Sequence, residues 1–590
     1  MRKAGAAARI VLLQAAANKL DADVSSLSTA NGYVVTADGE QVPYTAIAAL
    51  AAEIEPPEDP PLKPQSDWKI LGRSLPRVDM LAKCTGTAEY SIDVQLPGML
   101  HATVKMNPNL GGEMRSYDAS RAETMPGVEK VLPLDGGVAV IASNTWLAFK
   151  AANAIEFDWG DAPYPDSTAE QFKVLEDAFL GGEDSQFRDD GDVEEIIANT
   201  TVIEGEYRAP YLAHATMEPL NAVALLKDDR LDIWAGNQNP TQAVKEGAKI
   251  ANVDAENVHV HTTLMGGGFG RRMEMDFVKL AVHVAMAMPG TPVKTTWSRE
   301  EDMQHDTYRP LAIARFKAAV DNGAATALDL KIASPSVTSS TLQRLGISIV
   351  GPDVAIVQAA WDQPYAIENY RVSGYRAPEL LPISSWRSVG ASQNGFFHES
   401  AIDELAHAAG TDPMEMRLSL MSDDTSRKVL EAAAHMSNWG SELAPGVGRG
   451  VAFVMSFGVQ VAEVIEVADT PLGIKILKVY AAVDIGTALD PRNVEAQVQS
   501  GVNFGLAAAI MGEISIADGA VEQSNFHNYD AIRMRQAPAI EVKILENGDQ
   551  IRGIGEPATP PAAPALANAI FAANGNRIRE LPLNKHIKFE

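Results

Sequence analysis

Two glycine-rich segments that lie far apart in the chain constrain its fold more than any other feature. Residues 553–557 read Gly-Ile-Gly-Glu-Pro, and residues 266–272 read Gly-Gly-Gly-Phe-Gly-Arg-Arg. Glycine lets the backbone approach a ligand closely, and proline fixes the turn that directs the side chain of Glu556. One Gly-x-Gly-Glu-Pro run is most often a solvated turn. Two glycine loops in one chain together indicate a large cofactor that is held from several sides.

The loop 266–272 lies between a predicted strand, 258–261, and a predicted helix, 275–288. It lacks the Lys-Ser/Thr ending of a P-loop, and Arg271 breaks the Gly-x-Gly-x-x-Gly pattern, so neither ATP nor a Rossmann dinucleotide is favoured. A glycine loop between strand and helix still offers backbone N–H groups to oxyanions. Arg271 and Arg272 could pair with phosphates. The alternative is a plain loop with solvated arginines.

A second candidate segment, residues 386–394, reads Trp-Arg-Ser-Val-Gly-Ala-Ser-Gln-Asn and opens a predicted helix. Because Arg387 stands between a tryptophan and small residues, we expect it to be partly buried. A buried arginine needs an anion or a carbonyl group as its partner. The alternative is an internal salt bridge with Glu399 or Glu404.

Amide side chains and one His/Glu pair complete the candidate set. Gln238 and Asn239 follow the predicted strand 231–234, where two amides suit a ring with mixed donors and acceptors, although such a motif is most often a turn. His214 and Glu218 share one face of a turn. Because no second cluster of histidines or carboxylates accompanies them, we expect packing or support of neighbouring residues rather than metal binding.

Composition limits the classes of function. A chain of 590 residues is too long for one hydrophobic core, and a net charge of -28 would repel nucleic acid and anionic membranes. Cys84 is the only cysteine, so the chain cannot hold an iron–sulfur cluster or form an internal disulfide. We expect Cys84 to be a small buried residue rather than a nucleophile. The sequence has no apolar run of about 18 residues, so no membrane span is predicted.

The order of predicted elements indicates several mixed domains. A helix at 4–20 and a hairpin at 33–43 precede a proline-rich linker at 56–61, and the acidic stretch 181–195 is expected to be a surface loop. The other predicted strands are 100–104, 128–132, 138–141, 231–234, 258–261 and 474–483. The other predicted helices are 119–125, 144–153, 241–251, 275–288, 396–409, 412–421 and 493–510.

Taken in order along the chain, these motifs resemble the molybdenum hydroxylase family, which includes xanthine dehydrogenase and aldehyde oxidase relatives. The likeness is closest to the large, molybdopterin-binding subunit of isoquinoline 1-oxidoreductase type. Its characteristic runs are matched at 214–220, 386–390, 523–527 and 553–561. The resemblance covers nearly the whole chain, and the combination of motifs is highly specific.

The resemblance implies a multidomain α+β fold. We expect residues 1–62 to be the remainder of an N-terminal molybdopterin-binding region with its linker, and residues 63–165 to form an α/β hammerhead domain. Residues 166–445 and 446–590 would then form two molybdopterin-binding domains of the aldehyde oxidase/xanthine dehydrogenase type, the second carrying the catalytic glutamate.

The resemblance also implies a cofactor, molybdopterin cytosine dinucleotide with molybdenum. Glu556 matches the family's catalytic base, which takes a proton from a metal-bound hydroxide as the oxygen attacks an electron-poor carbon. Arg387 matches the arginine next to the metal, where it would stabilise developing negative charge. The remaining matched positions are expected to contact the cofactor: Gln238, Gly267, Gly268, Phe269, Gly270, Arg271 and Gln497.

As the resemblance implies, such a chain oxidises an aldehyde or hydroxylates an N-heteroaromatic ring with oxygen from water. Its electrons pass to a small subunit that carries two [2Fe-2S] clusters. A cytochrome c subunit and a separate N-terminal chain are further candidate partners. The resemblance favours the periplasm over the cytoplasm, although this chain carries no export signal.

The sequence departs from the family pattern at several points. The Met-Gly-Gln-Gly loop that contacts the pterin in relatives does not occur, Ala391 replaces a frequent histidine, and Val389 replaces an aromatic residue of purine-oxidising relatives. A stacked purine is therefore a less favoured substrate. Two alternatives stay open. The chain is a truncated or non-catalytic homologue, or it is one half of a split large subunit that needs a partner chain to bind the cofactor.

Overall fold

The computed structural model describes residues 1–347 and 351–590, which divide into two compact units, Met1–Leu75 and Pro76–Glu590. In the first unit, helix α1 (Arg2–Leu20) packs on a small antiparallel sheet of β1 (Ser28–Ala30), β2 (Tyr33–Val35) and β3 (Gln41–Pro43). Alanines on one side of α1 meet Val34 and Val42 in a small core. The predicted helix and hairpin are confirmed.

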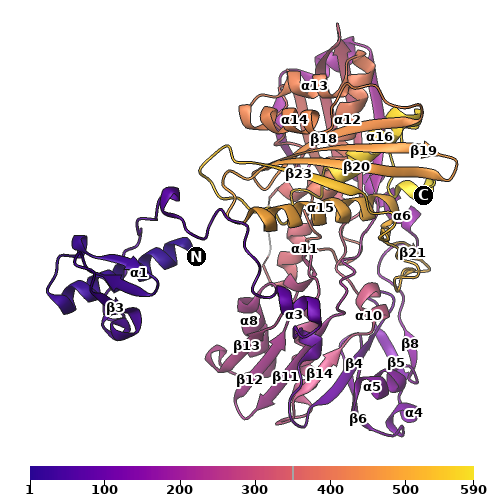
Figure 1. Cartoon of the computed structure of the whole chain (residues 1–590). Coiled ribbons are helices and arrows are strands. Elements are labelled where there is room, and N and C mark those ends of the chain that lie inside the picture. The colour runs from indigo at the N-terminus through magenta and orange to yellow at the C-terminus, as the bar shows by residue number, and fades with distance from the viewer. Residues whose placement is uncertain (348–350) are drawn as a thin grey trace. The chain divides into compact units, whose positions relative to one another are not determined.

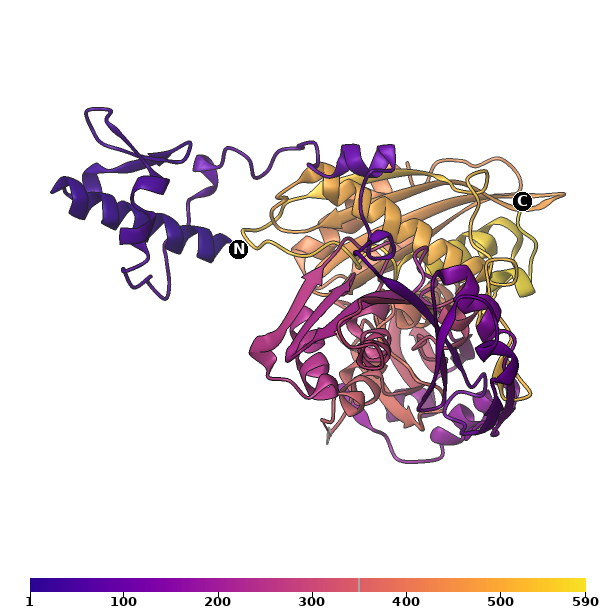
Figure 2. The same ribbon diagram turned by 90° about the horizontal axis from the view of Figure 1, so that it is seen from below.

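A seven-stranded mixed sheet forms one side of the second unit, in purple to magenta in Figures 1 and 2. Its central contact is the parallel pair of β4 and β14. The pair joins strands of the predicted hammerhead range to strands of the next predicted domain, so one sheet spans both ranges. In order across the sheet, the strands are β13 (Val258–Thr262), β12 (Arg230–Ala235), β11 (Asn221–Lys227), β14 (Val293–Thr296), β4 (Leu100–Met106), β7 (Gly137–Ala142) and β6 (Val128–Leu134).

Helices cover this sheet with their apolar faces. Helix α9 (Asp276–Met286) packs on β11, α8 (Pro240–Ala251) packs on β13, and α5 (Thr145–Ala152) packs on β4 and β7. Gly247 of α8 allows the close approach, since an added Cβ would lie 3.0 Å from Ile233. The glycine loop 266–272 connects β13 to α9, as predicted.

A five-stranded sheet stands next along the chain. Its order is β10 (Val202–Ala209), β15 (Ala312–Asp321), β16 (Ala324–Pro335), β17 (Asn369–Ala377) and β9 (Ser185–Asp190). The prediction of a surface loop at 181–195 is therefore wrong. The stretch forms β9, which pairs with β17, and then opens helix α7 (Val193–Asn199). Acidic residues locally favour loops, and the strand forms only because β17, its partner, lies far along the sequence.

A four-stranded sheet, orange and yellow in Figure 1, completes the second unit. It consists of β18 (Val447–Ser456), β19 (Val459–Thr470), β20 (Gly473–Asp484) and β23 (Ala539–Leu545). Helix α16 (Ala562–Asn574) lies against β18 because Gly448 and Gly450 carry no side chain: an added Cβ at Gly450 would lie 2.1 Å from the backbone of Ala569. Helix α12 (Ala391–Ala409) is buried between this sheet and the five-stranded one.

Helix α15 (Pro491–Met511) runs beside β23 and α16, as Figure 1 shows. The remaining helices of more than one turn are α3 (Met80–Thr85), α6 (Thr168–Ala178), α10 (Arg299–Gln304), α11 (Val337–Arg344), α13 (Pro413–Leu420) and α14 (Asp424–Met436). Cys84 lies on α3 and is exposed, so the prediction of a buried cysteine is wrong. Within the described residues, every helix is too short or too polar to span a membrane.

Candidate functional site

Three segments that are distant in sequence meet around the aromatic ring of Phe504 on α15. The ring centroid of Phe504 lies 4.7 Å from that of Phe269 in the glycine loop and 4.7 Å from that of Trp386. The Arg387 guanidinium lies 5.4 Å from the same ring. The candidate segments 266–272 and 386–394 are thus neighbours, and α15 is the element that joins them.

The third segment, with Glu556, lies against the same helix because α15 has a Gly-x-x-x-Gly spacing. A Cβ at Gly501 would lie 2.9 Å from the Cβ of Ala558, and a Cβ at Gly505 would lie 2.6 Å from the carbonyl oxygen of Thr559. These two glycines let the turn after Pro557 approach the helix closely. The turn carries Glu556 to the edge of the aromatic cluster.

The Glu556 carboxylate is half-buried and held at one oxygen. The backbone N–H of Ser388 donates to Glu556 Oε1 at 3.0 Å, and the Ser388 hydroxyl donates to the Glu556 carbonyl oxygen at 2.8 Å. Among the described residues, Oε2 accepts no hydrogen bond. One oxygen fixes the side chain and the other is left to take a proton.

Arg387 is buried, with 6% of its surface exposed, and its partners are carbonyl and hydroxyl oxygens. Nε and Nη2 donate to the carbonyl oxygen of Gly555 at 2.8 and 2.5 Å, and Nη1 donates to Ser500 Oγ at 3.1 Å. Nη2 also lies 3.5 Å from the backbone oxygen of Gln497. Burial lowers the pKa of Arg387 to about 10, and the charge of Glu556 opposes that shift.

The expected carbonyl partner of Arg387 is confirmed, and the alternative salt bridge is wrong. Glu399 pairs with Arg417, and Glu404 pairs with Arg579. The Arg387 guanidinium donates two hydrogen bonds to the carbonyl oxygen of Gly555, which directly precedes Glu556. Arg387 therefore fixes the position of the Glu556 carboxylate. Gln497 meets Arg387 through its backbone oxygen, while its side chain is half-buried.

The glycine loop is shaped by contacts that exclude side chains. The Gly270 N–H donates to Gln238 Oε1 at 3.2 Å, and a Cβ at Gly268 would lie 2.7 Å from that oxygen. A Cβ at Gly270 would lie 1.4 Å from the carbonyl oxygen of Ser385. The structure therefore brings Gln238 and the loop together, and it presses the loop against the segment that carries Arg387.

Arg271 and Arg272 differ from the expectation of a phosphate-binding pair. Arg271 is 1% exposed and forms ion pairs with Asp276 and Asp306, and Arg272 is fully buried against Glu218. Both guanidinium groups are committed to protein partners, so neither side chain is free to pair with a phosphate. They are not solvated arginines either, because both are buried and their ion pairs stabilise the loop.

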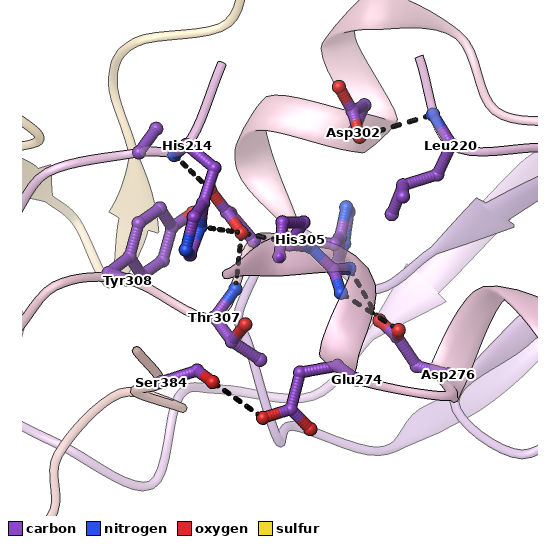
Figure 3. A network of polar contacts seen from close by, with 12 residues as sticks. His214, Leu220, Glu274, Asp276, Asp302, His305, Thr307, Tyr308 and Ser384 are labelled. Carbon is purple, nitrogen blue, oxygen red and sulfur yellow. Dashed lines mark hydrogen bonds and ion pairs between the residues drawn. The ribbon is translucent and has the colours of Figure 1, made fainter. Parts of the chain in front are cut away.

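His214 lies in the buried polar network under the loop (Figure 3), and Glu218 is buried beside Arg272. His214 donates its backbone N–H to Asp306 at 2.6 Å, and its ring contacts the same carboxylate. Glu218 accepts from the N–H of Gly266 at 2.7 Å. Burial raises the pKa of Asp302, a neighbour in this network, to about 6. The two residues support neighbours, as the sequence indicated.

Three non-glycine residues at the site have left-handed backbone conformations: φ is 56° at Phe269, 77° at Ser388 and 48° at Val389. Such conformations are costly for residues with a Cβ and persist where the surroundings enforce them. One of them, Ser388, carries the N–H that holds Glu556, and Val389 follows it directly. The strain is concentrated where the backbone has to direct donors and side chains.

Sequence reasoning missed four contributors to the site: Ser388, Ser500, Phe504 and Asp306. Ser388 stands beside Arg387 in a run that was recognised, so its neighbour was a usable signal. Ser500 and Phe504 follow Gln497 at helical spacing on the same face. Asp306 carried no signal, because it reaches His214 only through the fold, 92 positions along the chain.

Comparisons with known proteins agree on one group of relatives. Two family models described as molybdopterin cofactor-binding domain match residues 181–421 and 385–538. The chain is 29% identical to the beta subunit of isoquinoline 1-oxidoreductase from Brevundimonas diminuta, covering 99% of this chain and 81% of the relative. It is 30% identical to a subunit of nicotinate dehydrogenase from Pseudomonas putida, covering 99% of this chain and 52% of that relative.

Solved structures show the same fold. Quinoline 2-oxidoreductase from Pseudomonas putida 86 superposes with a TM-score of 0.73 at 16% identity, covering 87% of this chain and 97% of the other. The aldehyde oxidoreductase from Desulfovibrio gigas also gives 0.73 at 16% identity, covering 91% of this chain and 82% of the other.

Proposed function

The chain belongs to the molybdopterin cofactor-binding family of molybdenum hydroxylases, and we propose that it hydroxylates an N-heteroaromatic ring or oxidises an aldehyde with oxygen taken from water. It is a molybdenum-dependent oxidoreductase of the aldehyde, xanthine and isoquinoline oxidoreductase type. The observation that carries the proposal is a pair of contacts: Ser388 donates a hydrogen bond to the Glu556 carboxylate, and Arg387 donates to the Gly555 carbonyl oxygen.

The residues around Glu556 fit a bound cofactor. A Cβ added at Gly553 or Gly555 would meet no atom within 4 Å, so the backbone beside Glu556 borders open space. The loop N–H groups of Gly267, Gly268 and Phe269 have no partner among the described residues, and oriented N–H groups suit an anionic group. We propose the cytosine dinucleotide form of molybdopterin there, held by these N–H groups and by Gln238 and Gln497.

When bound, the cofactor supplies the oxygen transfer and accepts the two electrons. Glu556 then acts as the general base. Its Oε1 stays with the Ser388 N–H, and Oε2 takes the proton that the attacking water-derived oxygen must lose. The amide bond at Oε1 orients the carboxylate before substrate arrives, so little reorganisation is needed at the moment of reaction.

Arg387 acts chiefly by position. Three of its nitrogens contact Gly555, Ser500 and Gln497, and Nη1 carries a second N–H with no partner among the described residues. That N–H is available to a bound group. Any stabilisation by Arg387 of negative charge that develops on the reacting group would act through this second N–H of Nη1.

The substrate side supports a compact ring or an aldehyde rather than a stacked purine. Val389 offers no aromatic face, and Ala391 is fully buried in a small cluster with Ala359 and Val454. A histidine at position 391 would displace that cluster. We propose that the substrate is recognised by apolar contact next to Val389.

Relatives whose names describe them as subunits of an enzyme imply that this chain works within a complex. We propose a small partner with two [2Fe-2S] clusters, because the single exposed cysteine of this chain cannot hold a cluster. A cytochrome c subunit is a further proposed acceptor, and the proposed compartment is the periplasm.

Turnover in H₂¹⁸O tests the proposal. The chain, co-expressed with its neighbouring reading frames, would be assayed for molybdenum and then incubated with an aldehyde or an N-heterocycle and an artificial electron acceptor. We expect ¹⁸O in the product of one class. A molybdenum-loaded enzyme that converts neither class, or that takes oxygen from O₂, contradicts the proposed reaction. A preparation that never binds molybdenum favours the non-catalytic alternative.

A further inference from the structure

We propose that His214 is a positioning residue, held as a buried imidazolium that ties the segment of Arg387 to the glycine loop. The catalytic consequence rests on the proposed function, whereas the charge state of the ring rests on the geometry alone. His214 is 2% exposed and comes from the run His-Ala-Thr-Met-Glu-Pro, which is otherwise explained only by packing.

Both ring nitrogens of His214 face oxygen atoms that only accept hydrogen bonds. Nδ1 lies 2.9 and 3.0 Å from the two carboxylate oxygens of Asp306, and Nε2 lies 3.2 Å from the carbonyl oxygen of Ser385. A neutral imidazole donates from one nitrogen only, so one of these contacts would set two lone pairs against each other. The doubly protonated ring satisfies both.

Asp306 cannot supply the missing proton. The backbone N–H groups of His214 and Thr307 donate to its carboxylate, and Arg271 forms an ion pair with it at 2.9 Å. Backbone donors and a neighbouring guanidinium favour the charged form of a carboxylate over the neutral form. The negative charge lies between His214 and Arg271, which offsets the cost of burying both cations.

The charged and titratable groups that border His214 come from several elements. Asp306 and Arg271 lie on the side of Nδ1, and the titratable His305 and Tyr308 belong to the same segment as Asp306. A cavity of about 170 Å³ is lined by His214 and otherwise mainly by alanine and aromatic residues. The titratable groups of that cavity besides His214 are Tyr529 and Asp530. Asp306 carries the closest negative charge.

The bond from Nε2 matters because Ser385 stands two positions before Arg387. The Ser385 carbonyl is also the atom against which Gly270 packs. His214 therefore links Asp306 and Arg271 beneath the loop to Ser385, and Arg387 carries the link on to Gly555. Removing the Nε2 proton would break the hydrogen bond to the Ser385 carbonyl oxygen. The segment of Arg387 would then be less firmly fixed, and with it the position of Glu556.

Nitrogen NMR of the full chain labelled with ¹⁵N-histidine tests the charge state. At pH 7.5 we expect the His214 ring to carry a proton on both nitrogens, and its signal is assigned by its loss in His214→Gln. The ring of His305 also faces two backbone oxygens, at 3.0 and 2.9 Å, so His305→Gln identifies its separate signal. His261 is the matched control, since its Nε2 contacts Asp232 at 2.9 Å while its side chain is 44% exposed. His261→Gln should leave the buried signal in place. A His214 ring with either nitrogen unprotonated overturns the proposal.

Two variants test the positioning role in the cofactor-loaded enzyme. An asparagine amide reaches the place of Nδ1, and a glutamine amide reaches the place of Nε2. We therefore expect His214→Asn to lower kcat on the order of 100-fold with little change in KM, because a small misplacement near the chemistry costs about that much. His214→Gln should retain more activity, and His261→Gln should match the wild type.

Equal activity of wild type and His214→Asn, with molybdenum bound, overturns the positioning role. If neither variant folds, the NMR measurement on the wild type still decides the charge state. If Glu556→Gln keeps full turnover, the proposed function fails while the NMR result on His214 stands.

Discussion

The backbone N–H of Ser388 donates to Oε1 of Glu556 at 3.0 Å, across 168 positions of sequence. The same serine donates its hydroxyl to the Glu556 carbonyl oxygen, so both ends of the glutamate are held by one residue. Ser388 has a φ of 77°, which is unfavourable for a residue with a Cβ. The fold thus maintains local strain at the point that fixes the acidic group.

Glu556→Gln isolates the proton transfer. Glutamine keeps an oxygen that can accept from the Ser388 N–H, so the turn should retain its shape, but it cannot take a proton. We expect turnover to fall by about 10² to 10⁴-fold, the usual contribution of a general base, with molybdenum content unchanged. Steady-state kinetics and metal analysis on the same preparation provide the measurement.

Glu580→Gln is the control for that loss, because Glu580 lies in the same C-terminal region with a side chain that is 42% exposed. Its activity should equal that of the wild type. If Glu556→Gln turns over as fast as the wild type, Glu556 is not the general base.

Alanine substitutions at Gly270 and Gly555 should distinguish two roles of glycine. Gly270 allows close packing within the protein, and Gly555 leaves open space beside Glu556. Gly270→Ala places a Cβ 1.4 Å from the Ser385 carbonyl oxygen at a φ of 112°, so we expect a large loss of thermal stability. Gly555→Ala meets no protein atom within 4 Å. Its melting temperature should stay close to the wild type, while the methyl group intrudes beside Glu556 and lowers cofactor content or turnover.

Differential scanning calorimetry and molybdenum analysis of both variants provide the test. A Gly555→Ala protein with normal molybdenum content and turnover would show that the open space beside Glu556 is not used. A Gly270→Ala protein as stable as the wild type would show that the loop and Ser385 are not in firm contact.

Glu463 in the centre of β19 should make stability depend on pH. It is fully buried, both of its carboxyl oxygens lack partners among the described residues, and burial raises its pKa well above the ordinary value. The unfolded chain ionises near the ordinary pKa and the folded chain does not. Stability is therefore fully present below the unfolded pKa and is lost as pH rises, by about 1.4 kcal/mol per pH unit.

Glu463→Met removes this titration and keeps a similar length. We expect the variant to unfold at a higher temperature than the wild type at pH 8, with the difference shrinking as the pH approaches 4.5. A difference between the two proteins that stays constant over this range would mean that Glu463 has a partner in solution.

The sequence was most informative where candidate site residues stand in local runs. Glu556 and Arg387 were selected as candidates from their glycine, proline and tryptophan neighbours, and helices such as α8 and α15 followed from apolar spacing. Arg271 was misjudged because its partners Asp276 and Asp306 are supplied by the fold. The stretch that forms β9 was misjudged because its pairing with β17 outweighs the local preference of acidic residues for loops. Non-local pairing of this kind leaves no signal in one sequence.

The pair of Glu399 and Arg417 gives a last test, since the sequence offered Glu399 as a partner for a different arginine. Both side chains are fully buried, and Glu399 also accepts from the Tyr365 hydroxyl at 2.7 Å and from the Phe453 N–H at 2.8 Å. Burial alone would raise the pKa of Glu399, but Arg417 and the hydrogen bonds outweigh it and the pKa is lowered. The carboxylate therefore stabilises the fold at neutral pH and loses that effect as the pH falls through the lowered pKa.

Glu399→Gln leaves the buried Arg417 with Asp403, 3.8 Å from Nη1, as its remaining counter-ion, so we expect a loss of about 3 kcal/mol in unfolding free energy at pH 7. Glu541→Gln breaks an exposed pair with Lys478 and should cost less than about 1 kcal/mol. Urea denaturation of both variants at pH 7 and pH 4 provides the comparison. The gap between wild type and Glu399→Gln should narrow at pH 4, because protonation then weakens the wild-type pair. A loss at pH 7 no larger than that of Glu541→Gln would mean that Arg417 finds another partner in the core.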